Sequence, residues 1–544
     1  MNMLQKVIQR RGIYFLSVCV LFVTTQQIVV HADEPTAEIQ KRVDAIGQQI
    51  RSATVRIRSG SDVSSGVIVS ENGLVLTVAH GLKTNAATIV MLPGKGSYKA
   101  KQLVVDASAD IALLSINIAS TDAATNHFVP LSNDAVCTCG DVVMAAGFPA
   151  REPDGQSVVV RLGEILASDD SAMKTSCTLT SGDSGGPLVN SRGELIGLNR
   201  QIGTSVESNG HITIEAIQRV LENTEFWTTL TQQPRTEPRC QIGTNSFHPR
   251  PAVVRAARES TVEVYGTDFQ GNVAIRACGT ILDTLHIATK LSEIAGCTAL
   301  ECRFADDSKI DATLSKLDRT RDLAILTLES PGKFIGITPS VKSKSRTDDS
   351  LVDRIVFSAI SLSEISAAGI ISRTDHPEPA LPARFGATMH EDSGHLRVTE
   401  LSPNGSAVTA GLQVGDELQQ LDGSAATSLT AVGKMLQSRQ PGDWIILNIK
   451  RGDRQLRINA RLQHDPSQQF EKTEFLDGRA GHVSQRRSNF HALQHDIAIA
   501  PAACGGPLLD MHGHIVGINI ARRARESTLA FPIDIVVQLL EKDR

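Results

Sequence analysis

The sequence predicts a protein dominated by β-strands, in which one folding unit occurs twice and a smaller domain interrupts the second copy. Three observations lead to this prediction. A glycine-rich turn between strand patterns, Gly185 to Asn199, returns as Gly505 to Asn519. An aspartate motif, Asp106 to Leu114, returns as Asp318 to Leu326. Within the second copy the pattern changes after Ser372 and resumes only near the C-terminus.

The amino terminus indicates export. Basic residues precede an apolar run from Ile13 to Val23, and small residues follow up to Ala32. This order is typical of a secretory signal peptide over residues 1–32, because a membrane anchor needs ~20 apolar residues. The 544 residues have room for three or four domains of ~150 residues. The net charge of −5 and the 4% aromatic content argue against nucleic-acid binding.

The turn from Thr180 to Val189 carries the chemistry of the first copy. Its glycines let the backbone turn tightly, which aims the amides of Gly182 and Ser184 at one point, where an oxyanion would form. Ser184 is the candidate nucleophile and needs a base and an acid upstream. His80, which closes a strand pattern, and Asp110, which opens one, supply both. Each motif alone is more often structural, but the three in this chain order predict a serine-protease site of the chymotrypsin type.

The second copy keeps the spacing of these positions but changes the residues. The base position holds Ser292, the acid position holds Asp322, and the nucleophile position holds Cys504. Ser292 and Asp322 are 30 residues apart, as His80 and Asp110 are. No imidazole stands where it would activate the cysteine thiol, and His495 falls on a different strand position. We therefore predict that the second copy is a pseudoprotease, which retains the protease fold but lacks a working catalytic site.

The inserted module begins with Phe385, Gly386 and Ala387. A strand, a helix and two further strands follow, at 395–401, 428–438, 444–450 and 455–462. This order resembles a PDZ domain of the bacterial type, which pairs an extended peptide with a sheet edge and holds its carboxylate on backbone amides. The resemblance assigns the carboxylate-binding loop to Phe385, Gly386 and Ala387. The alternative is a small β-rich domain that only spaces two barrels.

These patterns predict the domain boundaries. A proline-containing linker at 231–250 separates the two units. The predicted parts are a signal peptide at 1–32, a protease unit at 33–230, a degenerate unit at 251–380 and 464–544, and a PDZ domain at 381–463. Eight of the nine cysteines remain in the mature chain, and their spacing neither assigns disulfide pairs nor matches a zinc site.

On these motifs, the first unit resembles the trypsin-like serine proteases, and its combination with a PDZ domain resembles the Deg/HtrA family. The duplicated layout resembles paired trypsin-like proteins of some bacteria. The resemblance implies an all-β, chymotrypsin-like double β-barrel, duplicated here, with the site between two six-stranded barrels. It also implies that His80 takes the proton of Ser184 and returns it to the leaving amine. Asp110 would hold the imidazole while an acyl-enzyme forms.

The chain departs from the resemblance in three places. Deg proteases usually have Gly-Asn-Ser-Gly-Gly, whereas Asp183 precedes Ser184 here. In animal zymogens the matching aspartate pairs with a newly cut amino terminus, and no such activation site precedes the first barrel, so Asp183 needs another partner. Thr178 stands where trypsin has its specificity aspartate, which predicts an S1 pocket for small or medium apolar side chains. The PDZ domain lies inside the second unit, so the trimerisation of the Deg/HtrA family is not predicted for this chain.

The sequence therefore predicts an exported, periplasmic or secreted serine endopeptidase, a hydrolase acting on polypeptides. Unfolded or damaged proteins are the substrate class implied by the resemblance. The PDZ domain is expected to bind peptide C-termini or extended segments. A peptide-binding, chaperone-like scaffold with negligible turnover is the alternative, and an esterase is a third. No cofactor, metal, nucleic-acid partner or membrane span after signal cleavage is implied, and no oligomeric state is indicated.

Overall fold

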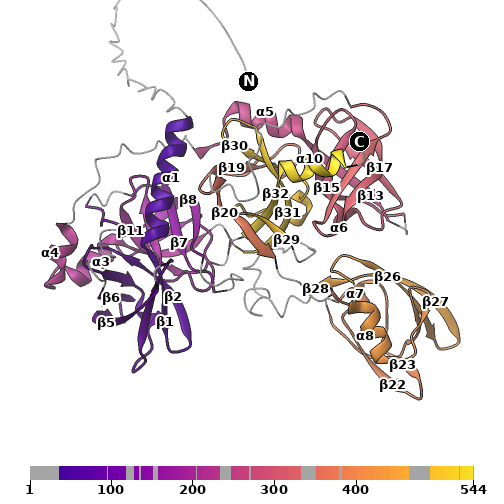
Figure 1. Cartoon of the computed structure of the whole chain (residues 1–544), viewed down its shortest axis with the longest axis horizontal. Helices are drawn as coiled ribbons and strands as arrows, with labels where there is room; N and C mark the ends of the chain where they lie inside the picture. Colours follow the sequence, from indigo (N-terminus) through magenta and orange to yellow (C-terminus); the bar gives the residue numbers. More distant parts are fainter. Residues whose placement is uncertain are drawn as a thin grey trace, which may run out of the picture. The chain divides into compact units, whose positions relative to one another are not determined.

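The computed structural model describes residues 36–542, apart from gaps chiefly at 118–127, 134–136, 151–156, 233–246, 333–350, 379–382 and 465–489 and some single positions. The predicted signal peptide and most of the predicted linker lie outside the described residues. Strands dominate the rest of the chain (Figure 1). None of the described helices combines the length and the apolar character needed to cross a membrane.

The first unit consists of two closed six-stranded barrels. Helix α1 (Thr36–Ala53) leads into the first barrel, which has the strand order β1-β2-β3-β6-β5-β4. The second barrel has the order β10-β11-β12-β9-β8-β7 and is followed by two helices. The elements are β1 (Thr54–Ser59), β2 (Asp62–Ile68), β3 (Leu74–Thr77), η1 (Ala79–Gly81), β4 (Thr88–Leu92), β5 (Gly96–Asp106), β6 (Ile111–Ile116), β7 (Val142–Gly147), β8 (Val159–Ser168), β9 (Ala172–Thr175), β10 (Pro187–Asn190), β11 (Leu195–Gln201), β12 (Asn209–Thr213), α3 (Ile214–Leu221) and α4 (Phe226–Thr231).

The second unit repeats this architecture strand by strand. Helix α5 (Pro251–Ser260) takes the place of α1, and the third and fourth barrels have the orders β13-β14-β15-β18-β17-β16 and β19-β20-β29-β32-β31-β30. The duplicated double barrel predicted from the sequence is thus confirmed. The elements are β13 (Thr261–Thr267), β14 (Val273–Ile281), β15 (His286–Lys290), α6 (Leu291–Ile294), β16 (Ala299–Arg303), β17 (Lys309–Asp318), β18 (Leu323–Leu328), β19 (Ile355–Ser358), β20 (Gly369–Glu378), β29 (Phe490–His495), η5 (Pro501–Ala503), β30 (Pro507–Asp510), β31 (Ile515–Ala524), β32 (Ser527–Pro532) and α10 (Ile533–Glu541).

The inserted domain stands between β20 and β29 and has a hydrophobic core of its own. Its main sheet has the order β22-β23-β24-β26-β27, so β22 is an edge strand. The elements are β21 (Ala383–Arg384), β22 (Ala387–Asp392), β23 (His395–Leu401), α7 (Ser406–Thr409), β24 (Glu417–Leu421), β25 (Ser424–Ala425), α8 (Leu429–Gln437), β26 (Trp444–Arg451), β27 (Arg454–Arg461) and β28 (Gln463–His464).

The two double-barrel units share one hydrophobic core. A single cluster of buried apolar side chains includes Ile46 and Ile50 of α1 together with Phe357 and Ile370 of the second unit. Burying apolar surface from both units in one cluster favours a fixed association, since each buried side chain contributes about 1.5–3 kcal/mol. The second unit therefore supports the first through this shared core.

Candidate active site

His80 and Asp110 lie on two neighbouring loops of the first barrel. His80 is in η1, just after β3, and Asp110 directly precedes β6 with a φ of 60°. His80 Nδ1 is 2.8 Å from Asp110 Oδ2, and the His80 backbone amide donates to Asp110 Oδ1 at 2.9 Å. The aspartate thus fixes both the ring and the backbone of the histidine, which leaves Nε2 as the ring nitrogen available to a substrate or nucleophile.

Asp110 is held in its ionised form. Burial alone would raise the pKa of this carboxyl, but hydrogen bonds from the His80 ring and amide, with the charge of Arg200, lower the pKa overall. Arg200 Nε is 3.2 Å from Asp110 Oδ2, and its side chain is 44% exposed. Sequence reasoning missed Arg200, which follows the repeated Gly-Leu-Asn motif of β11.

Ser184 comes from the second barrel and meets the first across a backbone hydrogen bond. The Ser65 amide donates to the Ser184 carbonyl at 2.8 Å. Ser184 Oγ donates to the Arg200 carbonyl at 3.5 Å, and the side chain of the same Arg200 contacts Asp110. No hydrogen bond joins Ser184 Oγ to His80 in the part of the chain that the structure describes. The serine therefore belongs to the same site as the pair, although in this structure its hydroxyl is not bonded to the imidazole, as is often the case without substrate.

The turn before Ser184 has the shape that an oxyanion hole requires. Gly182 has a φ of 97°, and a Cβ there would lie 2.7 Å from the Ala150 amide nitrogen, so only glycine fits. The Gly182 carbonyl accepts a hydrogen bond from Ser65 Oγ at 2.7 Å. Among the described residues, the amides of Gly182 and Ser184 have no protein acceptor. Both amides are thus available to an incoming oxyanion.

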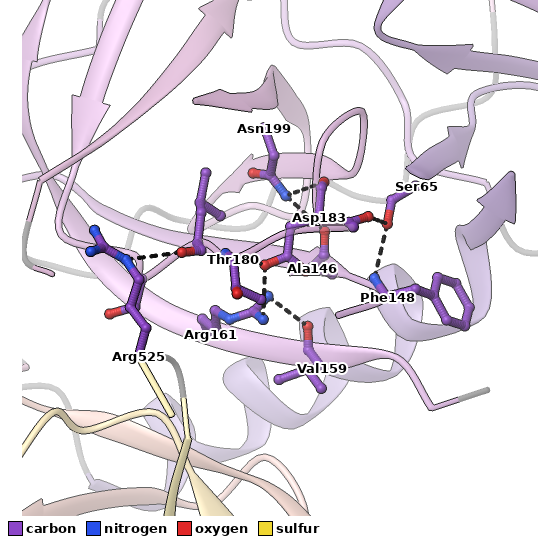
Figure 2. A network of polar contacts seen from close by, with 12 residues as sticks. Ser65, Ala146, Phe148, Val159, Arg161, Thr180, Asp183, Asn199 and Arg525 are labelled. Atoms are coloured by element: carbon purple, nitrogen blue, oxygen red, sulfur yellow. Dashed lines mark hydrogen bonds and ion pairs between the residues drawn. The ribbon is translucent and has the colours of Figure 1, made fainter. Parts of the chain in front are cut away.

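The partner that Asp183 needs is Arg161. Its guanidinium Nη2 is 3.0 Å from Asp183 Oδ2, and both side chains are completely buried (Figure 2). The same carboxylate oxygen accepts the Thr180 amide at 2.8 Å. Sequence reasoning missed this pair. The available signal was one arginine within the apolar run of β8, since a buried cation needs a counterion.

Thr178 lies in the segment that leads to this turn. It is buried, and its hydroxyl donates to the Val206 carbonyl at 3.3 Å. The contact joins the segment before Ser184 to the loop before β12. No acidic side chain stands at position 178.

The degenerate site keeps the backbone geometry of the first. The Ser292 amide donates to Asp322 Oδ1 at 2.8 Å, and the Ser292 hydroxyl donates to Asp322 Oδ2 at 2.7 Å. Asp322 has a φ of 59°, nearly that of Asp110. The Cys278 amide donates to the Cys504 carbonyl at 3.0 Å, as Ser65 does to Ser184. The two copies thus have similar geometry at these positions, with a hydroxyl in place of the imidazole.

The turn before Cys504 differs from the turn before Ser184. Residues Pro501–Ala503 form the 3₁₀ turn η5, and the Cys504 amide donates to the Pro501 carbonyl at 3.1 Å. An amide used in this way is not available to an oxyanion. Cys504 itself is fully buried. His495 is also fully buried, its Nε2 is 2.9 Å from Asn519 Oδ1, and burial lowers its pKa to about 4.

The loop at the start of β22 has its carbonyls tied to the interior of the inserted domain. The Phe385 carbonyl accepts the Ala407 amide and the Ser406 hydroxyl, both at 3.0 Å, and the Gly386 carbonyl accepts the Ser402 amide. Gly386 has a φ of 80°. Edge strand β22 adjoins α8, because the Leu429 amide donates to Glu391 Oε2 at 3.0 Å.

One group of described side chains has the spacing of metal ligands. Ligand atoms of Asp510, His512 and His514 lie within 4.8 Å of one another. Asp510 Oδ1 already accepts the amides of both histidines at 2.9 Å, and the imidazoles are exposed. These three residues belong to the β30–β31 hairpin and are part of neither the Ser184 site nor the Cys504 site. Seven cysteines are free thiols in the described part of the chain.

Comparison with known proteins agrees with this geometry. The family model described as trypsin-like peptidase domain matches residues 64–198, and that of the PDZ domain matches residues 383–462. The first unit is thus similar to trypsin-like peptidase domains over residues 64–198. A probable periplasmic serine endoprotease, DegP-like, of Pseudomonas putida strain F1 is 31% identical over 153 residues, covering 27% of this chain and 31% of the relative.

Longer matches are weaker. A probable periplasmic serine protease, do/HhoA-like, of Haemophilus influenzae is 24% identical over 430 residues, covering 75% of this chain and 81% of the relative. The crystal structure of a serine endoprotease from Yersinia pestis is 17% identical and covers 78% of this chain and 98% of that one, at a TM-score of 0.30, which is too low to support an argument. The chain spans about a third of the length of the Pseudomonas relatives. The resemblance to HtrA-like, trypsin-like serine proteases is confirmed.

Proposed function

We propose that the chain is an exported serine endopeptidase that hydrolyses peptide bonds of polypeptides in its peptidase domain. The observation that carries the proposal is the His80–Asp110 pair at 2.8 Å beside Ser184, whose own amide and that of Gly182 have no acceptor among the described residues. The names of the relatives as periplasmic serine proteases support both export and the reaction class. Unfolded or damaged proteins are the substrate class that this likeness suggests.

In this mechanism, Ser184 is the nucleophile and His80 acts first as a base and then as an acid. His80 takes the proton of Ser184 as the hydroxyl attacks the scissile carbonyl, and then gives it to the leaving amine. Asp110 fixes the ring through Nδ1 and stabilises the imidazolium. The amides of Gly182 and Ser184 donate to the oxyanion, and water then hydrolyses the acyl-enzyme. With Thr178 at the S1 position, small or medium apolar side chains are the expected P1 residues.

The second unit is proposed to be a pseudoprotease. Ser292 contacts Asp322 where an imidazole would be needed, and the Cys504 amide is bonded to the Pro501 carbonyl. A thiol without a base and without an oxyanion hole has neither activation nor transition-state stabilisation. The PDZ domain is proposed to bind peptide C-termini or extended segments along edge strand β22, at the Phe385–Ala387 loop.

The decisive experiment treats the mature protein with a fluorophosphonate probe and locates the label by mass spectrometry. We expect labelling at Ser184 that disappears in Ser184→Ala and persists in the matched second-site variant Cys504→Ala. Hydrolysis of an unfolded protein substrate should follow the same pattern. An intact, folded protein that neither labels nor hydrolyses would refute the endopeptidase. The alternative, a peptide-binding or chaperone-like scaffold, would then be favoured, and peptide binding unchanged in Ser184→Ala would support it.

A further inference from the structure

The segment from Thr178 to Ser184 shapes both the S1 wall and the oxyanion turn, and two buried arginines contact it (Figure 2). We propose that Arg161, from the peptidase domain, and Arg525, from the second unit, are positioning residues that hold this segment in its reactive shape. The inference rests on the proposed function, since it assigns Ser184 as the nucleophile. It also gives the degenerate unit a role, because this unit completes the substrate site of the other unit within the same chain.

Arg161 acts on the end of the segment next to the nucleophile. Asp183 stands between Gly182 and Ser184, whose amides form the proposed oxyanion hole. Its completely buried carboxylate needs a counterion, and Arg161 Nη2 at 3.0 Å supplies one. The Thr180 amide donates to the same carboxylate oxygen, so the ion pair and the turn are fixed together. Because the cation belongs to the folded chain, the turn forms without a cleavage that creates a new amino terminus.

The strand that carries Arg161 is held by the second unit. Asp496, just after β29, accepts the Leu162 amide of β8 at 2.6 Å and the Ile370 amide of β20 at 2.8 Å. One side chain thus joins a strand of the peptidase domain to a strand of the second unit. Leu162 is the residue next to Arg161, so the position of the guanidinium depends on this junction.

Arg525 acts on the other end of the segment. It lies between β31 and β32 of the second unit and is 1% exposed. Its Nε donates to the Leu179 carbonyl at 3.1 Å, and its Nη2 donates to Asn209 Oδ1 at 3.0 Å and to the Ser205 carbonyl. Leu179 follows Thr178, and Ser205 and Asn209 lie close in the chain to Val206, to which Thr178 donates. One guanidinium from the second unit therefore ties the segment that carries Thr178 to the loop before β12, and we propose these two segments as the walls of the S1 pocket.

The first test is a cycle of variants in the full mature chain: Arg161→Met, Asp183→Asn and the double variant. Each single variant leaves one buried group without its counterion. We expect each to lower kcat for a peptide substrate about 10²–10³-fold with little change in KM. This is the effect of losing one hydrogen-bond donor of an oxyanion hole. The double variant removes both charges of the pair, so we expect kcat to return to within about tenfold of the wild type.

The cycle remains informative if a single variant does not fold. The double variant keeps the packing without the two charges of the pair, and Arg161→Lys keeps the cation. An Arg161→Met variant with wild-type kcat would overturn the role of Arg161. So would a folded double variant that is as inactive as the single ones, because coupling between the two charges would then be absent.

The second test addresses Arg525 through the P1 residue of the substrate. We expect Arg525→Met to lower kcat/KM about tenfold or more for a P1 valine substrate and to change a P1 glycine substrate much less, because only the former fills the S1 pocket. General destabilisation would lower both equally. The control is Asp353→Asn, which removes the negative charge that the second unit places against Arg51 of α1. This variant should leave the ratio of kcat/KM for the two substrates unchanged. If Arg525→Met left the ratio of kcat/KM for the valine and glycine substrates unchanged, the proposed role of Arg525 would be overturned.

These failures are distinct from failure of the proposed function. Absence of fluorophosphonate labelling in the wild type would refute the endopeptidase itself. A wild type labelled at Ser184, with Arg161→Met labelled at the same rate and Arg525→Met unchanged in its preference for P1 valine over P1 glycine, would leave the endopeptidase intact and refute only the two positioning roles.

Discussion

Gly147, the last residue of β7, allows a direct test of how closely the nucleophile turn is packed. A Cβ at this position would lie 2.9 Å from Asp183 Cα and closer still to a carboxylate oxygen of Asp183. Ordinary carbon contacts are about 3.5–4.0 Å, so Gly147→Ala requires the backbone of the turn to move by roughly 0.5–1 Å. Overpacking of this kind costs about 1–3 kcal/mol, and a 1 Å misplacement of catalytic groups costs about 10²-fold in rate. We therefore expect kcat/KM to fall about 10²-fold.

The matched control is Gly433→Ala, in helix α8 of the PDZ domain. A Cβ at Gly433 meets no atom within 4 Å, and alanine in a helix interior is favoured over glycine by about 0.5–1 kcal/mol. The assay measures peptide hydrolysis and the rate of fluorophosphonate labelling, with urea unfolding of the same samples. Gly433→Ala should keep both rates and be slightly more stable. Wild-type rates and stability in Gly147→Ala would refute the close packing of the turn on β7.

Three further predictions follow from the same contacts. Asp110→Asn should lower kcat about 10⁴-fold while the fold is kept, because an amide no longer fixes the His80 tautomer; circular dichroism checks the fold. Iodoacetamide should alkylate the exposed Cys139 in the folded protein and spare the buried Cys504 until urea is added, as peptide mapping would show. The third concerns acid stability. Burial lowers the pKa of His495 from its ordinary 6.5 to about 4, so the unfolded chain binds the proton more readily between these values. This contribution to stability is present above pH 6.5 and is lost as the pH falls, by about 2 kcal/mol at pH 5. His495→Gln should therefore lose about 2 kcal/mol less than the wild type between pH 8 and pH 5, and an equal loss in both would contradict the buried neutral imidazole.

The sequence predicted the parts of this molecule that depend on local patterns. Gly182 needs a positive φ, which only its own neighbourhood imposes. His80 and Asp110 were recognised from the residues around each of them, although β4 and β5 separate β3 from β6 in the chain. The repeat then carried the fold of the first unit to the second. Strand boundaries in the PDZ domain agreed to within a residue for the same reason, as with the strand from His395 to Leu401.

What the sequence did not predict is contact between distant segments. The Arg161–Asp183 pair depends on how the second barrel closes, since β8 and the turn before β10 are brought together only by strand pairing around the barrel. Arg525 is still more remote, because its acceptors Leu179 and Asn209 belong to the other unit. A buried cation in an apolar strand indicates that a counterion exists, but it does not say which one.

The contrast between the two units bears on why the second one keeps its fold. The turn before Cys504 is a 3₁₀ turn that uses the Cys504 amide. If the second unit is the pseudoprotease proposed above, selection for catalysis does not account for its retained barrel order. The residues through which it contacts the peptidase domain, Asp496 and Arg525, lie at strand ends of its second barrel, and their positions are set by closure of that barrel. If Asp496 and Arg525 hold the substrate site, then loss of the barrel would remove both of these contacts. A unit without a working site would thus be retained because its geometry, rather than its chemistry, is what the neighbouring site uses.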